Sequence, residues 1–162
     1  MGIKHYWILQ QTHNIKNVYG EYIYIGAEYG LNRTIDSDIF MEEEISVLVH
    51  IDDIQIYNNS QIQVWPIIIK IFYKNYICKS FVVALYCEDS KLLSAFHYLN
   101  DFTIEAIKLI TENVTNRKTY SFGIIVIIAN SPARSSVKCI KSPGAFYACE
   151  RCIPSKGLLV GE

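Results

Sequence analysis

The stretch Ile45-Ser-Val-Leu-Val-His-Ile-Asp-Asp-Ile-Gln-Ile-Tyr57 decides the fold, because it joins a β-branched apolar run to two acidic residues. Its composition predicts a strand, and Asn58-Asn59-Ser60 predicts a turn after it. Apolar residues over 63–73 and 78–87 predict two further strands. Three consecutive strands joined by short turns predict an antiparallel meander.

A helix and a fourth strand are expected after the meander. Apolar residues between 92 and 110 recur at mostly three- and four-residue spacing, which predicts a helix that ends near 116–118, with or without a break near 100–103. The continuous apolar run over 121–129 predicts a strand buried on both faces. Two strands joined across a helix are expected to be parallel. The first and fourth strands then lie side by side in a 3-2-1-4 order, an element order that other mixed α/β sheets share.

Length and composition predict one globular domain, since the chain has 162 residues, 51% of them hydrophobic and 19% charged. A net charge of −1 argues against strong DNA binding by the chain as a whole. The charge is nevertheless uneven, with acids concentrated over 36–53 and bases over 117–156. Two interpretations of the basic segment stay open: an ordinary solvated surface, or a segment that lies near phosphates.

Neither a secretory signal nor a membrane-spanning segment is expected. Residues 1–10 contain no long apolar run, and three lysines interrupt the apolar stretch from 65 to 87. We therefore expect an intracellular protein, nuclear or cytoplasmic, that is not secreted and has no membrane partner. Residues 19–30 predict a short strand followed by a turn or short helix.

Candidate metal ligands lie at the ends of the first and fourth strands. Mg²⁺ prefers oxygen ligands, and two-metal nucleases need carboxylates that converge from adjacent strands. Asp52 and Asp53 end the first strand, and only one of them can face the site because neighbouring strand residues alternate between faces. The matching position at the fourth strand is Asn130, placed before a helix that Ser131 is expected to cap. Two surface carboxylates near a strand end are the alternative interpretation.

A second candidate metal site is the Cys-x-x-Cys motif of Cys149 and Cys152. Zinc requires four tetrahedral ligands, and Cys139 is a possible third. Structural zinc and simple free thiols remain comparable alternatives, whereas a redox role is less favoured because the motif does not follow an early strand.

Two blocks of sequence resemble a family of transposon-derived proteins found in invertebrate genomes, akin to the CACTA-type transposases. The first block is Val49-His50-Ile51-Asp52-Asp53-Ile54 with Asn59-Ser60 and Trp65-Pro66-Ile67. The second is Asn130-Ser131-Pro132-Ala133-Arg134 with Lys138-Cys139-Ile140-Lys141 and Tyr147-Ala148-Cys149-Glu150-Arg151-Cys152. The segment from Gly20 to Gly26 is similar to the one that precedes the first strand in that family. The likeness covers about residues 8 to 157.

The resemblance implies a ribonuclease-H-like core and Mg²⁺-dependent cleavage and transfer of DNA strands. Asp52 then corresponds to the first catalytic aspartate, Asn130 stands at the second, Asp53 replaces a glycine, and Pro143 replaces a histidine before the cysteine motif. A third acidic ligand normally comes from a later helix, for which the residues before Glu162 leave little room. We therefore expect a remnant of a transposase catalytic domain that is inactive as this chain.

The same resemblance predicts three segments and a set of partners. Residues 1–44 precede the core, 45–138 form a partial core, and 139–162 form a Cys-x-x-Cys tail. DNA is the ancestral partner, and a full-length transposase is a possible second one. The alternative function is a non-enzymatic module that binds nucleic acid or protein. The sheet is expected to be incomplete at its C-terminal side, and the open edge that results favours aggregation.

Overall fold

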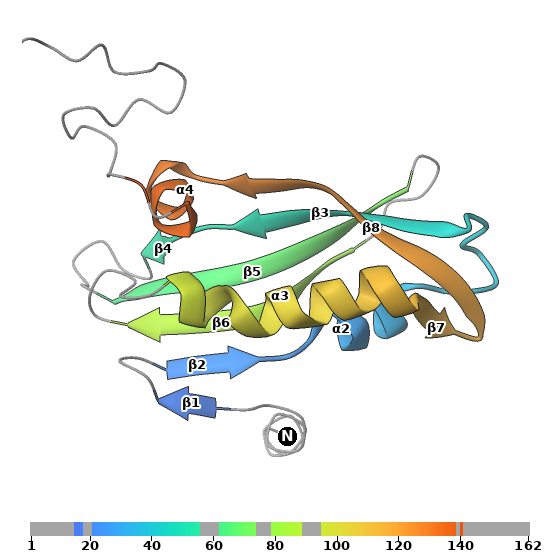
Figure 1. Ribbon diagram of the computed structural model, residues 1–162, viewed down its shortest axis with the longest axis horizontal. Coiled ribbons are helices and arrows are strands. Elements are labelled where there is room, and N and C mark those ends of the chain that lie inside the picture. Colours follow the sequence, from blue (N-terminus) through green and yellow to red (C-terminus); the bar gives the residue numbers. More distant parts are fainter. Residues whose placement is uncertain are drawn as a thin grey trace, which may run out of the picture.

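The computed structural model describes residues 15–17, 21–55, 62–73, 79–88, 95–138 and 140. These residues form one mixed β-sheet with helices packed against it (Figure 1). The elements in chain order are β1 (Ile15–Asn17), β2 (Glu21–Tyr24), α2 (Ala27–Thr34), β3 (Glu44–Ile51), β4 (Ile54–Gln55), β5 (Gln63–Phe72), β6 (Ser80–Glu88), α3 (Ala95–Glu112), β7 (Val114–Asn116), β8 (Lys118–Ala129) and α4 (Ser131–Val137). Most neighbouring strands are antiparallel, and the β3–β8 pair is parallel.

The predicted meander is confirmed in β3, β5 and β6. β5 pairs antiparallel with β3 on one side, where Val49 lies opposite Ile69, and with β6 on the other. The first strand is shorter than predicted, because it ends at Ile51 and a separate strand, β4, then pairs with β5. The interruption falls on Asp52 and Asp53, residues of a type that is depleted in strands.

The predicted helix is confirmed as one unbroken element, α3, but its end was placed too late. α3 stops at Glu112, and Asn113 follows with φ 67°, the left-handed conformation that commonly terminates a helix. The next residues form strand β7, which a turn with Arg117 at φ 54° joins to β8. The 100–103 segment does not break the helix.

The fourth strand, β8, is parallel to β3 as predicted, with Ile51 opposite Ala129. The sheet order β1-β2-β6-β5-β3-β8-β7 contains the expected 3-2-1-4 arrangement in its β6-β5-β3-β8 part. The prediction that β8 is buried on both faces was wrong. Four consecutive apolar residues are 43–53% exposed: Ile125, Val126, Ile127 and Ile128.

The core lies between one face of the sheet and the helices α2 and α3. Alternate residues of β3 and β5 point into it and are almost fully buried, among them Val47, Val49, Ile67 and Ile69. Trp65 of β5 and Tyr98 of α3 meet edge to face, with ring centroids 6.5 Å apart. Because β2 pairs with β6 and Leu31 of α2 joins the same core, the residues from 21 to 34 belong to this one packed unit.

Gly30 of α2 packs directly against the ring of Phe81 on β6. A Cβ atom at position 30 would lie within 3.0 Å of three ring carbons, a separation that real Cβ atoms do not show. Glycine normally costs a helix about 1 kcal/mol relative to alanine. Replacing Gly30 by alanine would therefore improve the helix propensity of α2. The steric overlap of the new Cβ atom with Phe81 outweighs this improvement, because the whole ring would have to move.

We expect Gly30→Ala to lower the free energy of unfolding by about 1–3 kcal/mol, the usual cost of overpacking. Urea denaturation followed by circular dichroism measures the change. Asn32→Ala, at an exposed position of the same helix, is the matched control and should not destabilise the chain to this extent. Stabilisation by Gly30→Ala would show that α2 can move away from β6.

Candidate functional site

The parallel strands β3 and β8 end side by side, and this places Asp52, Asp53 and Asn130 at one edge of the sheet. Ile51 is the partner of Ala129 in the register, so the two chains leave the sheet at the same level. The side chains of all three residues are half-buried. The structure therefore brings together the two segments that the sequence singled out.

Asp53, one of the two candidate acids and the one that the resemblance placed at a glycine position, makes the direct contact with Asn130. The Nδ2 group of Asn130 donates a hydrogen bond to Oδ1 of Asp53. Asp52 instead uses its Oδ1 to accept a hydrogen bond from the backbone N–H of Asp53, at 3.0 Å. The alternation of strand residues left either acid as the one that faces Asn130, whereas the resemblance selected Asp52.

Asn130 also begins α4. Its Oδ1 accepts a hydrogen bond from the backbone N–H of Ala133 at 2.9 Å, and its carbonyl oxygen accepts one from the N–H of Arg134 at 2.8 Å. Asn130 is therefore the N-cap of this helix, rather than Ser131 as predicted from the sequence. Both polar atoms of the Asn130 side chain have structural partners.

This set of groups does not fit a two-metal Mg²⁺ site. Two carboxylates are present, and the third group turns an N–H donor toward Asp53, whereas a metal ion requires oxygen acceptors. Among the described residues there is no group of three or more His, Cys, Asp or Glu side chains that could hold a metal ion.

The predicted zinc ligands cannot be placed in this site. Cys139, Cys149 and Cys152 lie outside the described residues, as does Pro143. The expectation of a zinc site thus remains a prediction.

A second polar cluster joins Glu105 of α3 to the start of α2. The Glu105 carboxylate accepts hydrogen bonds from the Tyr24 hydroxyl, from Ala27 N–H at 2.6 Å and from Glu28 N–H at 3.2 Å. Burial, and then the neighbouring Glu105 carboxylate, raise the pKa of Tyr24 well above its usual range, so the hydroxyl remains a donor. Each carboxylate oxygen has a backbone partner, which makes the cluster a helix cap rather than a reactive site.

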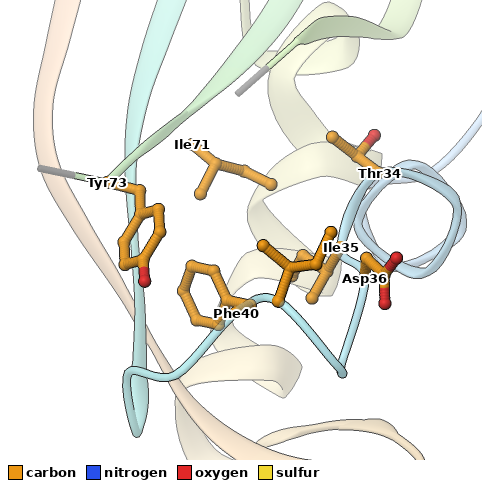
Figure 2. A pocket seen from close by; sticks show the side chains of 7 residues that line it. Thr34, Ile35, Asp36, Phe40, Ile71 and Tyr73 are labelled. Carbon is orange, nitrogen blue, oxygen red and sulfur yellow. The ribbon is translucent and has the colours of Figure 1, made fainter. Parts of the chain in front are cut away.

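A small apolar cavity lies at the margin of the core, near the end of β5 (Figure 2). It is lined by Ile35, Phe40, Ile71 and Tyr73, with the polar groups of Thr34 and Asp36 at its margin. Its volume of about 10 Å³ is at the lower limit for a single water molecule. The cavity is a packing defect and has no room for a ligand.

A larger, open and polar hollow lies where the α2–β3 loop meets the turn between β7 and β8. It measures about 370 Å³ and is lined by residues 32–38 together with Asn116 and Arg117. Asn116 Nδ2 donates to the carbonyl oxygens of Asn32 and Ile35, each at 3.2 Å, and Lys118 Nζ donates to that of Ser37 at 2.7 Å. These bonds tie the turn to the loop. The hollow lies at the opposite end of β8 from Asn130.

No protein-family model matches the chain, and no curated protein or solved structure is significantly similar to it. Within the described ranges, no helix has the length and apolar character needed to cross a membrane.

Proposed function

We propose that this chain is a remnant of a DNA transposase catalytic domain with a ribonuclease-H-like core, and that it no longer cleaves DNA. One observation carries the proposal: the ends of two adjacent parallel strands bring Asp52 and Asp53 together with Asn130. In a two-metal nuclease this edge of the sheet holds the catalytic carboxylates.

The strand arrangement supports this ancestry. Three antiparallel strands, a helix and a fourth strand parallel to the first occur in the 3-2-1-4 order. Other mixed sheets share this strand order, so the order alone does not indicate a transposase. It supports the ancestry only in combination with the sequence resemblance around Asp52 and Asn130. Both observations concern the same edge of the sheet.

The hydrogen bonds at that edge favour loss of activity. Cleavage of a phosphodiester by two metal ions needs anionic ligands that bind the cations and balance their charge. Asn130 carries no charge, and its amide is bound to Asp53 on one side and to the start of α4 on the other. The Asn130 amide thus donates a hydrogen bond to Asp53 Oδ1, the carboxylate oxygen that would otherwise be available to bind a metal ion.

The 162-residue chain is expected to show no DNA cleavage with Mg²⁺ or Mn²⁺. The measurement is nicking of supercoiled plasmid, which reports single cuts without knowledge of a target sequence. The same assay is applied to three variants purified in parallel: Asp52→Ala, Asp53→Ala and Asn130→Asp. Metal-dependent nicking that is lost in Asp52→Ala would contradict the inactive assignment, whereas nicking that persists in both alanine variants would identify a contaminating nuclease.

Nucleic-acid binding without cleavage is a second candidate function, favoured by the charge of α4. Arg134 of α4 and Lys138, which follows the last residue of this helix, are exposed, and the backbone N–H of Lys138 donates to the carbonyl oxygen of Arg134. Phosphate contacts by such residues weaken steeply with salt. A salt-sensitive mobility shift with duplex DNA, reduced in Arg134→Ala, supports binding; the absence of a shift at low salt excludes it.

A further inference from the structure

Three neighbouring strands carry aromatic side chains in a row across the core face of the sheet. Tyr22 of β2 lies opposite Tyr86 of β6, and Tyr86 lies opposite Trp65 of β5. Directly opposed residues of paired strands point to the same face of a sheet. Tyr98 of α3 packs over this row, with its ring centroid 6.1 Å from that of Tyr86 and 6.5 Å from that of Trp65. Four aromatic side chains therefore form the junction between the sheet and α3.

Three of these side chains bury a polar atom that makes no hydrogen bond to any described residue. The atoms are the hydroxyl oxygens of Tyr22 and Tyr98 and Nε1 of Trp65. All three residues are at most 5% exposed. Buried tyrosine hydroxyls and tryptophan N–H groups usually have a partner, because a buried donor without one has lost the hydrogen bonds that it made to water in the unfolded chain. Three such groups in one aromatic cluster point to a shared partner.

The chemistry of the cluster selects a partner that is uncharged and can both accept and donate hydrogen bonds. Burial, and then the neighbouring Tyr22 hydroxyl, raise the pKa of Tyr98, while burial, and then the Asp101 carboxylate, raise the pKa of Tyr22. Both hydroxyls therefore keep their protons and influence each other without a direct hydrogen bond. The nearby Asp101 disfavours an anion, and a buried cation would lie among apolar rings. Water meets these conditions.

We propose that this junction is a binding site for one ordered water molecule, which bridges the hydroxyls of Tyr22 and Tyr98 and accepts the hydrogen bond of the Trp65 indole N–H. The water accepts from the indole and from one hydroxyl and donates to the other hydroxyl. These are three hydrogen bonds, the number that is typical of a buried water. The water thereby connects β2 and β5 to α3 at a point where the side chains do not bond to one another directly.

Thermal denaturation of Tyr22→Phe, Tyr98→Phe and the double variant tests the proposal, since each change removes a hydroxyl and keeps the ring. We expect each single variant to lower the thermal midpoint by about 2–6 °C, the shift that follows from the loss of one buried hydrogen bond in a chain of this size. The double variant should lose less than the sum, because both hydroxyls bind the same water. Tyr120→Phe is the matched control: its hydroxyl is also buried without a described partner, but its ring contacts Phe40, which has no polar group to share a water. This control should not lower the midpoint.

A high-resolution crystal structure of the unmodified chain provides a second measurement that does not depend on the stability of the variants. We expect a water oxygen within hydrogen-bond distance of both hydroxyls, and its loss in the double variant. Four outcomes overturn the proposal: single variants at least as stable as the unmodified chain, losses that add in the double variant, an equal loss in Tyr120→Phe, or a side chain of the protein in place of the water.

Discussion

Replacing Glu105 by alanine is expected to lower the free energy of unfolding by about 2–4 kcal/mol, a sum of the costs of losing a helix cap and of leaving polar donors without a charged partner. Gly26 precedes α2 and has no side chain to cap it, so Glu105 of α3 takes this role. Its negative charge also lies at the positive end of the helix dipole. The effect therefore exceeds that of an ordinary surface glutamate.

Thermal and urea denaturation of Glu105→Ala beside Glu112→Ala measures this difference. Glu112 is an exposed residue at the end of the same helix, so its variant controls for charge and helix propensity. Glu105→Gln should fall between the two, since an amide oxygen still accepts a hydrogen bond but carries no charge. Equal stabilities of the two alanine variants would show that water can replace the Glu105 carboxylate at the start of α2.

The second large effect is expected from Asn130→Asp, which restores the acid that the resemblance assigns to this position. Aspartate caps a helix about as well as asparagine, so α4 keeps its cap. The donor to Asp53 is lost, however, and two carboxylates come to face each other. We expect a loss of about 1–3 kcal/mol at pH 7, the usual cost of leaving a half-buried polar group unpaired.

The sign of the pH dependence identifies the cause. Two facing carboxylates raise the pKa of one of them in the folded state above its value in the unfolded chain. The penalty is then present at neutral pH and disappears as the pH falls below the ordinary aspartate pKa of about 4. Denaturation of the variant and the unmodified chain at pH 7 and pH 4 measures this. Asn130→Ser, which keeps a cap without adding charge, should show a loss that does not depend on pH.

Divalent cations distinguish an empty charge cluster from a restored binding site. If the three acids of Asn130→Asp converge, Mg²⁺ or Mn²⁺ should raise the thermal midpoint of the variant and leave that of the unmodified chain unchanged, because a ligand stabilises the state that binds it. A variant insensitive to both pH and divalent cations would show that residue 130 does not face Asp53 in solution.

Local patterns in the sequence determined the three-strand meander, the long helix and the parallel fourth strand, whereas the short strands β4 and β7 were not predicted. The alternation of buried residues in β3 and the three- and four-residue spacing in α3 each follow from the geometry of a single element. The parallel pairing followed from the helix that connects two strands. The adjacency of residues 52–53 and 130 is a consequence of these three features.

Only the tertiary structure decided which groups meet at the strand ends. The chain leaves β3 at Ile51, and this turn directs Asp53 rather than Asp52 to Asn130. The cap of α2 comes from Glu105, a residue 78 positions beyond Ala27. The exposure of Ile125 to Ile128 depends on which strands and helices lie beside β8, and an apolar run alone carries no such information. Local periodicity determines how a segment folds, whereas burial and side-chain partners depend on distant segments that arrive at the same place.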